Sequence, residues 1–399
     1  MSKILIISCV FPPEPVVSAM LSEDIATGLS EEKRVVVLCP RPTRPKGFHF
    51  SQINAREDYK VVHLKSFTYA RSSLLGRLYE SYSFGKYCAK YINNHAQEFR
   101  LIYINSWPLF SQFRIIKSAK KFNIRSVIHI QDIYPESLIN KLPFCKKIAL
   151  KILLPIDKYS LRNATHIICI SENMKLFLQS TRKIPAEKFT VIPNWQNEEK
   201  FISYRSLNAR QRSGLRESLT FMYLGNNGPL AGVDHLIKSF IRANISNAKL
   251  IVAGAGSKTD ACKKLVSDLN GDGIEFLTVP EGKVAEIQDL ADVMLLPVKK
   301  NGAMSSIPSK LPAYMFSAKP IIGSLDLQSD TAKAIIQSGC GIVVEPENET
   351  ELINAMKEVS KWSKQVLEEK GNAGFEYGML HFSKKENLNK VISIIEYSI

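Results

Sequence analysis

The sequence lacks three features that define other classes of protein. It has no glycine before Gly28, so the GxGxxG loop of a nicotinamide-binding Rossmann enzyme is absent after the first predicted strand. Its seven cysteines form no CxxC pair and no zinc-binding spacing, and we expect them to be reduced core residues. No uninterrupted apolar run reaches the roughly 18 residues of a membrane-spanning helix. These absences argue against a dehydrogenase, a zinc protein and an integral membrane protein, and we expect a cytoplasmic protein.

The surplus of positive charge is confined to the first half of the chain. The formal net charge is +15. Up to Trp195 there are 29 Lys and Arg against 14 Asp and Glu, and the remainder has 24 of each. This asymmetry predicts that the first half meets something anionic, either phosphate groups or a negatively charged membrane surface. A basic surface that is merely solvated is the alternative. No nucleic-acid-binding module is recognisable, so we expect no nucleic-acid partner.

Strand and helix patterns alternate along the chain, which predicts parallel sheets covered by helices. The apolar run Lys3–Cys9 is typical of a buried strand, and the periodicity of Ser18–Leu29 predicts a helix after it. A second alternating series begins at Thr220, after a polar stretch that is the candidate linker.

We therefore expect an α/β protein with two Rossmann-like domains whose parallel sheets face a central cleft. The predicted divisions are an N-terminal domain at 1–195, a C-terminal domain at 196–375, and a helical segment at 376–399 that packs back on the first domain. Ligands of such sheets bind outside the carboxyl ends of the strands, so the informative residues should follow each strand.

In the first half, polar residues gather where the predicted strand at 125–130 ends. The run VIHIQDIYPES contains His129 and Asp132 beside a rigid Tyr134–Pro135 turn. We predict that Asp132 and His129 take part in catalysis. The alternative for His129 is a core histidine whose hydrogen bonds are satisfied within the fold.

In the second half, three loops rich in potential hydrogen-bond donors follow predicted strands. Glycine-rich loops allow a close approach of the backbone to phosphate oxygens, and a lysine at a helix start can neutralise them. The predicted donor-binding residues are Gly225, Asn226, Asn227, Gly254, Gly256, Ser305, Ser306, Ile307, Ser309 and Lys310. Ordinary turns favour the same residues, so each loop alone is a weak signal.

Several segments, in this order, resemble the retaining glycosyltransferases of family GT4, in particular the branch that builds bacterial surface polysaccharides such as O-antigen and capsule. The matching segments are FPPE, QDIYPES, ISENMK, VIPNW, YLGNNGPLAGVDHLI, VAGAGS, LADVMLLPV and IPSKLPAYMFSAKPII. The chain departs from the family at two positions that usually hold glutamates, here Ser305 and Ala313. The usual Arg and Lys of the diphosphate loop are replaced at about Asn226 and Ala231.

The resemblance implies the GT-B fold and a glycosyltransferase that retains anomeric configuration. The donor, expected to be a UDP-sugar, would bind the second domain with its base near Val279 and its diphosphate near Lys310, which would also assist the leaving group. The acceptor would be a polyprenyl-diphosphate-linked or other anionic saccharide, reached from the inner face of the cell membrane. No metal and no cofactor are expected. A GT-B-fold sugar-nucleotide epimerase and a catalytically silent sugar-nucleotide-binding protein are the alternatives.

Overall fold

The computed structural model describes residues 3–44, 50, 57–69, 74–105, 108–139, 146–208, 218–300, 302 and 307–398. The chain forms two compact units. Unit 1 comprises Met1–Ile192 together with Asn387–Ile399, and unit 2 comprises Pro193–Glu386. The functional boundaries at 195/196 and 375/376 stay predictions. Within the described ranges, no helix is both long enough and apolar enough to cross a bilayer.

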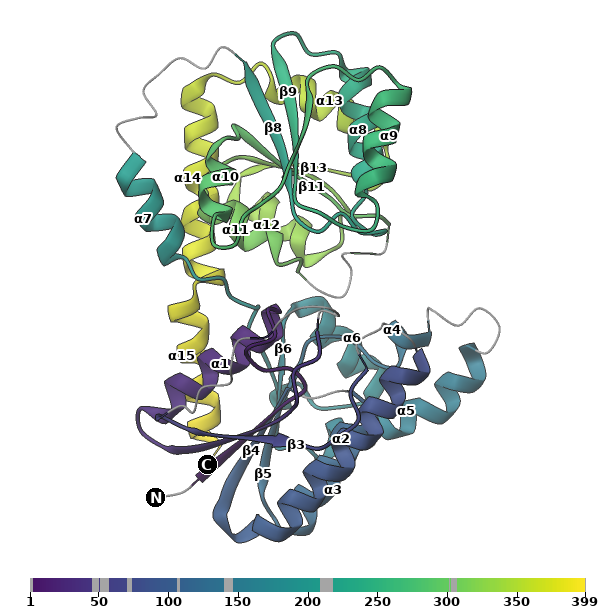
Figure 1. Ribbon diagram of the computed structural model, residues 1–399, viewed down its shortest axis with the longest axis vertical. Helices are drawn as coiled ribbons and strands as arrows, with labels where there is room; N and C mark the ends of the chain where they lie inside the picture. The colour runs from purple at the N-terminus through teal and green to yellow at the C-terminus, as the bar shows by residue number, and fades with distance from the viewer. Residues whose placement is uncertain are drawn as a thin grey trace. The chain divides into compact units, whose positions relative to one another are not determined.

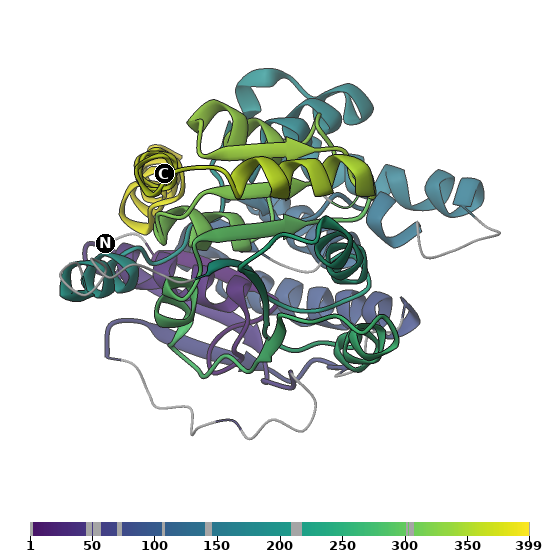
Figure 2. The same cartoon turned by 90° about the horizontal axis from the view of Figure 1, so that it is seen from above.

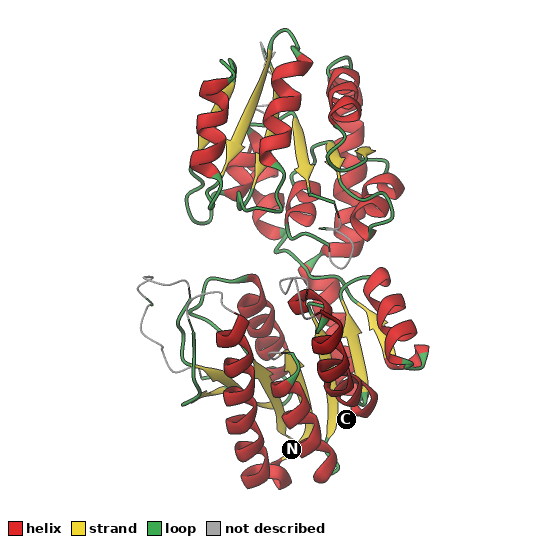
Figure 3. Cartoon of the chain, turned by 90° about the vertical axis from the view of Figure 1, so that its right-hand side faces the viewer, coloured by secondary structure: helices red, strands yellow, loops and turns green. Residues whose placement is uncertain are grey.

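Unit 1 is built on a seven-stranded parallel sheet with strand order β3-β2-β1-β4-β5-β6-β7. Helices cover both faces of the strands (Figure 3). Its elements are β1 (Lys3–Ser8), α1 (Val17–Ser30), β2 (Arg34–Pro40), β3 (Lys60–Leu64), α2 (Leu74–His95), a 3-10 turn (Ala96–Glu98), β4 (Phe99–Asn105), α3 (Phe110–Lys121), β5 (Arg125–Ile130), α4 (Glu136–Ile139), α5 (Lys146–Asn163), β6 (His166–Cys169), α6 (Glu172–Arg182), a second 3-10 turn (Ala186–Lys188) and β7 (Phe189–Val191).

The central strands of unit 1 are apolar on both faces because helices cover both. Four consecutive residues of β1, Ile4–Ile7, are fully buried. The final helix, α15 (Lys384–Tyr397), supplies part of this cover. It lies so close to α1 that a Cβ on Gly28 would stand 2.6 Å from the Cδ1 of Ile392. At its end, the Arg125 side chain donates to the carbonyl oxygen of Ser398 at 3.1 Å.

Unit 2 has a six-stranded parallel sheet with strand order β10-β9-β8-β11-β12-β13 (Figure 1). Its elements are α7 (Glu199–Asn208), β8 (Leu219–Leu224), α8 (Val233–Ala243), β9 (Ala248–Ala253), α9 (Thr259–Asp268), β10 (Ile274–Leu277), α10 (Val284–Asp289), β11 (Val293–Pro297), α11 (Lys310–Phe316), β12 (Ile321–Ser324), α12 (Asp330–Ser338), β13 (Gly341–Val344), α13 (Glu349–Val359) and α14 (Lys364–Phe382). The prediction of two parallel, helix-covered sheets is confirmed.

The predicted linker was wrong in one respect, because it contains helix α7. Phe201 of α7 is buried in the core of unit 2 and packs 5.9 Å from the ring of Phe316. Glu198, just before the helix, accepts hydrogen bonds from the Ser383 hydroxyl and from the Lys384 amide. Helix α7 therefore belongs to the folded unit 2.

In each sheet, strand order reverses direction between two neighbouring strands. This switch lies between β1 and β4 in unit 1 and between β8 and β11 in unit 2. Loops that leave the carboxyl ends of such strands diverge to opposite faces, which opens the position where ligands of α/β sheets bind. The loop after β8 carries Gly225, and the segment after β11 leads to Lys310.

Candidate functional site

The site in unit 2 begins where β8 and β11 separate. Their pairing covers only Phe221 with Val293 and Met222 with Met294. Beyond this pairing, the amide and the carbonyl oxygen of Leu224 form hydrogen bonds with the hydroxyl of Tyr314, where a paired strand would otherwise supply the partners. The sheet is therefore open at its carboxyl edge, directly before Gly225.

The glycine loops after β8 and β9 pack backbone against backbone. A Cβ on Gly254 would stand 2.4 Å from the carbonyl oxygen of Gly225, and one on Gly256 would stand 2.3 Å from that of Asn227. Gly254 also has φ +109°, a conformation that favours glycine. The glycines are needed for this contact between the loops.

The donor-binding role of Gly225 and Asn227 stays a prediction, but their backbone amides already have partners. The amide of Gly225 donates to the carbonyl of Ala253 and the amide of Asn227 donates to that of Ala255, each at 3.0 Å. These two amides already donate hydrogen bonds within the fold, so they are not available to a phosphate group. The side chain of Asn227 is itself buried, whereas Asn226 is exposed.

Lys310 contributes a positive charge at this edge of unit 2. Its side chain crosses the face of Gly225, where an added Cβ would lie 2.1 Å from the lysine Cε. The ammonium nitrogen stands 5.4 Å from the ring centroid of Tyr223. Burial lowers the pKa of Lys310. Among the residues that the structure describes, no carboxylate lies within ion-pair distance of it.

The remaining predicted donor residues differ in exposure and position. Ser309 is exposed and precedes α11, and Ile307 is half-buried against the core of unit 2. Val279, in the loop after β10, packs against the same core. Ser305 and Ser306 lie outside the described residues.

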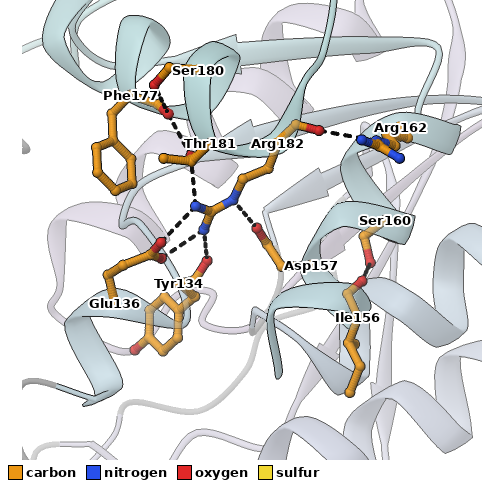
Figure 4. A network of polar contacts seen from close by, with 10 residues as sticks. All are labelled: Tyr134, Glu136, Ile156, Asp157, Ser160, Arg162, Phe177, Ser180, Thr181 and Arg182. Carbon is orange, nitrogen blue, oxygen red and sulfur yellow. Dashed lines mark hydrogen bonds and ion pairs between the residues drawn. The ribbon is translucent and has the colours of Figure 1, made fainter. Parts of the chain in front are cut away.

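In unit 1, Asp132 is exposed at the carboxyl end of β5, beside a turn held by a buried arginine. Arg182, at the end of α6, is fully buried and donates to both carboxylate oxygens of Glu136, at 2.6 and 2.7 Å (Figure 4). It also donates to Asp157 of α5 and to the carbonyl oxygen of Tyr134. The Arg182 side chain thus connects the turn after Asp132 to helices α5 and α6.

A second pair of carboxylates organises the loops at the same edge of the unit 1 sheet. Glu14, in the FPPE segment, accepts from the backbone amides of Thr43 and Arg44 at 2.6 and 3.0 Å. Glu80 of α2 accepts from the Tyr69 amide and from Arg44. Sequence analysis missed these roles because the partners lie 11 to 36 residues apart. No group of three or more His, Cys, Asp or Glu side chains suited to a metal occurs in the described ranges.

His129 lies in the core of unit 1 rather than at its surface. It is 2% exposed, and its Nδ1 lies 2.6 Å from the hydroxyl of Tyr103, which is itself buried. Burial lowers the pKa of His129 to about 4, so the ring is neutral at pH 7. Its catalytic role stays a prediction. The ring is buried as in a core histidine, but its Nε2 has no hydrogen-bond partner among the described residues, so the hydrogen bonds of the ring are only half satisfied.

We expect the stability of unit 1 to fall as the pH is lowered from 7 to 5, in part because of His129. The unfolded chain takes up a proton at this ring near pH 6.5, whereas the folded protein does so only near pH 4. Protonation therefore favours unfolding in this window, by about 2 kcal/mol between pH 7 and pH 5. Urea unfolding at pH 7 and pH 5 should show a smaller decrease in the free energy of unfolding for His129→Asn than for wild type. An equal loss in both proteins would show that His129 titrates normally.

Comparison with known proteins agrees with this architecture. The family model Glycosyltransferase Family 4 matches residues 21–200, and the model Glycosyl transferases group 1 matches residues 218–361. A probable glycosyltransferase, WbjE of Pseudomonas aeruginosa, is 21% identical over 258 residues, and the match spans 63% of this chain and 63% of that protein, less than two thirds of its length.

Two solved structures show the shared fold. The Anabaena protein HepE, in complex with UDP-glucose, superposes with a TM-score of 0.68 at 15% identity and covers 100% of both chains. WaaG, a glycosyltransferase involved in lipopolysaccharide biosynthesis, gives a TM-score of 0.66 at 14% identity, with 98% of this chain and 99% of that chain covered. These likenesses establish the GT-B fold expected from the sequence. The two matches together span most of the chain, so the chain consists of a family 4 glycosyltransferase domain followed by a group 1 glycosyl transferase domain.

Proposed function

We propose that the protein transfers a sugar from a nucleotide-diphosphate donor, expected to be a UDP-sugar, to a lipid-linked saccharide acceptor, with retention of configuration. The pathway would be bacterial surface polysaccharide synthesis. The observation that carries this proposal is Lys310: a half-buried ammonium, with no carboxylate within ion-pair distance among the described residues, at the switch point of the unit 2 sheet.

The donor would bind through its diphosphate at Lys310. A desolvated ammonium without a counter-charge gains more from a phosphate than an exposed lysine does, because the contact is weakly screened. HepE, which shares the fold, binds UDP-glucose. The same contact would neutralise the diphosphate as it leaves, which is the charge that develops in the transition state.

The carboxylates that this family usually places near the donor are missing here. Ala313 is buried on α11 and offers no group to the ribose. The nucleotide would therefore depend more on phosphate contacts than on ribose contacts, and we expect weak discrimination between ribose and deoxyribose in the donor.

A panel of nucleotide sugars tests the proposal directly. We expect at least one UDP-sugar to raise the melting temperature of the full chain, since a ligand that binds only the folded state stabilises it. Release of UDP with an acceptor extract, and none without it, would support transfer. Conversion of the sugar without any acceptor would favour the epimerase, and binding without turnover would favour a silent binding protein.

We predict that Asp132→Asn lowers turnover while the affinity for the donor changes little. The carboxylate of Asp132 is exposed in unit 1, which we assign to the acceptor, and it can accept the proton of an acceptor hydroxyl as the amide cannot. Loss of a general base typically costs about 100-fold or more in kcat. Steady-state kinetics and calorimetry with UDP separate the two effects, with the exposed Asp268→Asn as control. A wild-type rate for Asp132→Asn would remove this residue from the site.

We also propose that unit 1 rests on an anionic membrane surface. The first half of α5 exposes apolar side chains between lysines: Ile148 is 66% and Ile152 is 62% exposed. This part of α5 lies at the periphery of unit 1 in two perpendicular views (Figures 1 and 2). A groove of about 480 Å³ on it is lined by Lys146, Lys147, Leu150, Lys151, Leu154, Pro155 and Lys158.

Helix α2, which packs on α3 as α5 does, also exposes apolar side chains. Leu75, Tyr79 and Tyr82 are exposed on it, and one apolar cluster joins α2 to α5 through Leu78 and Leu153. Exposed aliphatic and tyrosine side chains beside lysines are typical of helices that lie in the membrane interface. The two exposed isoleucines lie between lysines, and this combination supports a membrane-facing role for α5.

We expect the protein to sediment with anionic vesicles at low salt and to be released as salt rises, because each lysine contributes only about 1 kcal/mol and is screened. Replacement of Lys146, Lys147 and Lys151 by glutamine should abolish sedimentation without unfolding. The matched control replaces Lys117, Lys120 and Lys121 of α3, which changes the net charge equally. An equal loss of sedimentation in both variants, or binding of the wild type to neutral vesicles, would contradict a membrane-binding surface located on α5.

A further inference from the structure

A buried hydroxyl joins the end of β8 to the helix that carries Lys310. Tyr314 lies four residues after Lys310 on α11 and is fully buried. The amide of Leu224 donates to the Tyr314 hydroxyl at 2.9 Å, and the hydroxyl donates to the carbonyl oxygen of Leu224 at 2.8 Å. One hydroxyl can make both bonds because it has one proton and two lone pairs.

These two bonds replace a missing stretch of sheet. Leu224 pairs with Ala253 of β9 in the register of the sheet, but its partner on the other side is absent because β8 and β11 pair only as far as Met222 and Met294. A buried amide and carbonyl without hydrogen-bond partners destabilise the fold. The Tyr314 hydroxyl supplies those partners and so allows β8 and β11 to separate.

The same hydroxyl fixes where Lys310 lies. Residues four apart on a helix share a face, so Tyr314 and Lys310 both point toward the end of β8. Tyr314 binds Leu224, and the Lys310 side chain crosses the next residue, Gly225, with no space for a Cβ between them. A displacement of α11 along β8 would therefore move the ammonium relative to the loop at 225–228.

We propose that Tyr314 is a positioning residue for the nucleotide-diphosphate site: its hydroxyl holds α11 against the open end of β8 and so sets the place of the Lys310 ammonium. This inference rests on the proposed function, because it assumes that Lys310 binds the diphosphate. It predicts that the hydroxyl matters for the phosphate part of the ligand and not for the nucleoside.

Calorimetry on the full chain tests it with UDP and uridine as probes. We expect Tyr314→Phe, which keeps the ring, to weaken UDP binding about 10-fold and uridine binding less than about 2-fold. In the Lys310→Met background the same substitution should change UDP affinity by less than about 2-fold, because the two residues act through one ammonium. Tyr103→Phe, which removes a buried hydroxyl in unit 1, is the matched control and should leave both affinities unchanged.

The outcomes are distinct. If Lys310→Met weakens UDP binding and Tyr314→Phe does not, or if the two effects multiply, the inference is wrong and the proposed function stands. If wild type binds no nucleoside diphosphate, both are wrong. Should Tyr314→Phe fail to fold, Gly225→Ala provides a second test, because the three atoms nearest to the added Cβ all belong to the Lys310 side chain, which must move away from residue 225. Unchanged UDP affinity in that folded variant would overturn the inference.

Discussion

Arg182→Met should lower the free energy of unfolding by about 3 to 5 kcal/mol, the usual result when one partner of a buried ion pair is removed. Arg182 is fully buried and makes charged hydrogen bonds to Glu136 and Asp157. Burial already raises the pKa of Asp157 to about 6 although the guanidinium opposes this shift. Without the guanidinium, Asp157 must take up a proton or remain as an uncompensated buried charge. Urea unfolding of the full chain, with hydrogen exchange at β5 and β6, measures the loss in unit 1.

Two further variants separate charge from packing. Arg242→Met breaks an exposed ion pair with Glu349 and should cost less than about 1 kcal/mol. Adding Glu136→Gln and Asp157→Asn to Arg182→Met should restore part of the stability, since no buried charge then lacks a partner. A triple variant no more stable than Arg182→Met would assign the loss to packing alone.

Lys310→Met should weaken the binding of UDP by about 10- to 100-fold, which corresponds to about 1.5 to 3 kcal/mol for a charge-assisted contact with phosphate. Methionine preserves the packing of the chain on Gly225 and Tyr223, so the change isolates the ammonium. Uridine affinity should stay within about 2-fold of wild type, because the nucleoside has no phosphate.

The control for Lys310→Met is Lys357→Met, which removes an exposed lysine of α13 in the same unit. It should leave UDP binding unchanged, as expected for a screened surface charge. Calorimetry at two salt concentrations adds a second criterion, since a partly buried contact depends less on salt. Equal losses for UDP and uridine in Lys310→Met would place the lysine elsewhere in the site.

The sequence predicts the sheets well because their strands are buried on both faces. Runs such as Ile4–Ile7 and Val293–Pro297 are apolar without interruption, and only parallel sheets covered by helices need such strands. Helix α7 escaped prediction because its anchors are few. Among residues 199–205, whose side chains the structure describes, Phe201 is the buried one, and Glu198 bonds to residues about 185 positions away.

The site was predictable only in its outline. Lys310 and the glycine loops follow strands, and that position is visible in the sequence. The use of the Gly225 and Asn227 amides by neighbouring carbonyls depends on how two loops pack, and the Leu224 to Tyr314 bonds join residues 90 positions apart. Such pairings leave no periodic signal, so the structure is needed to find them.

The last helix has a consequence for the order of assembly. During synthesis the first 192 residues are complete while the ribosome still has the whole of unit 2 to make. Val391 and Ile395 of α15, which are fully buried in the folded chain, are synthesised after unit 2. Until then the surface of α1 around Gly28 lacks the cover that Ile392 gives it in the folded chain, so we expect unit 1 to reach its full stability only after unit 2 has been synthesised. The first unit therefore takes part of its core from residues that follow the second unit in the chain.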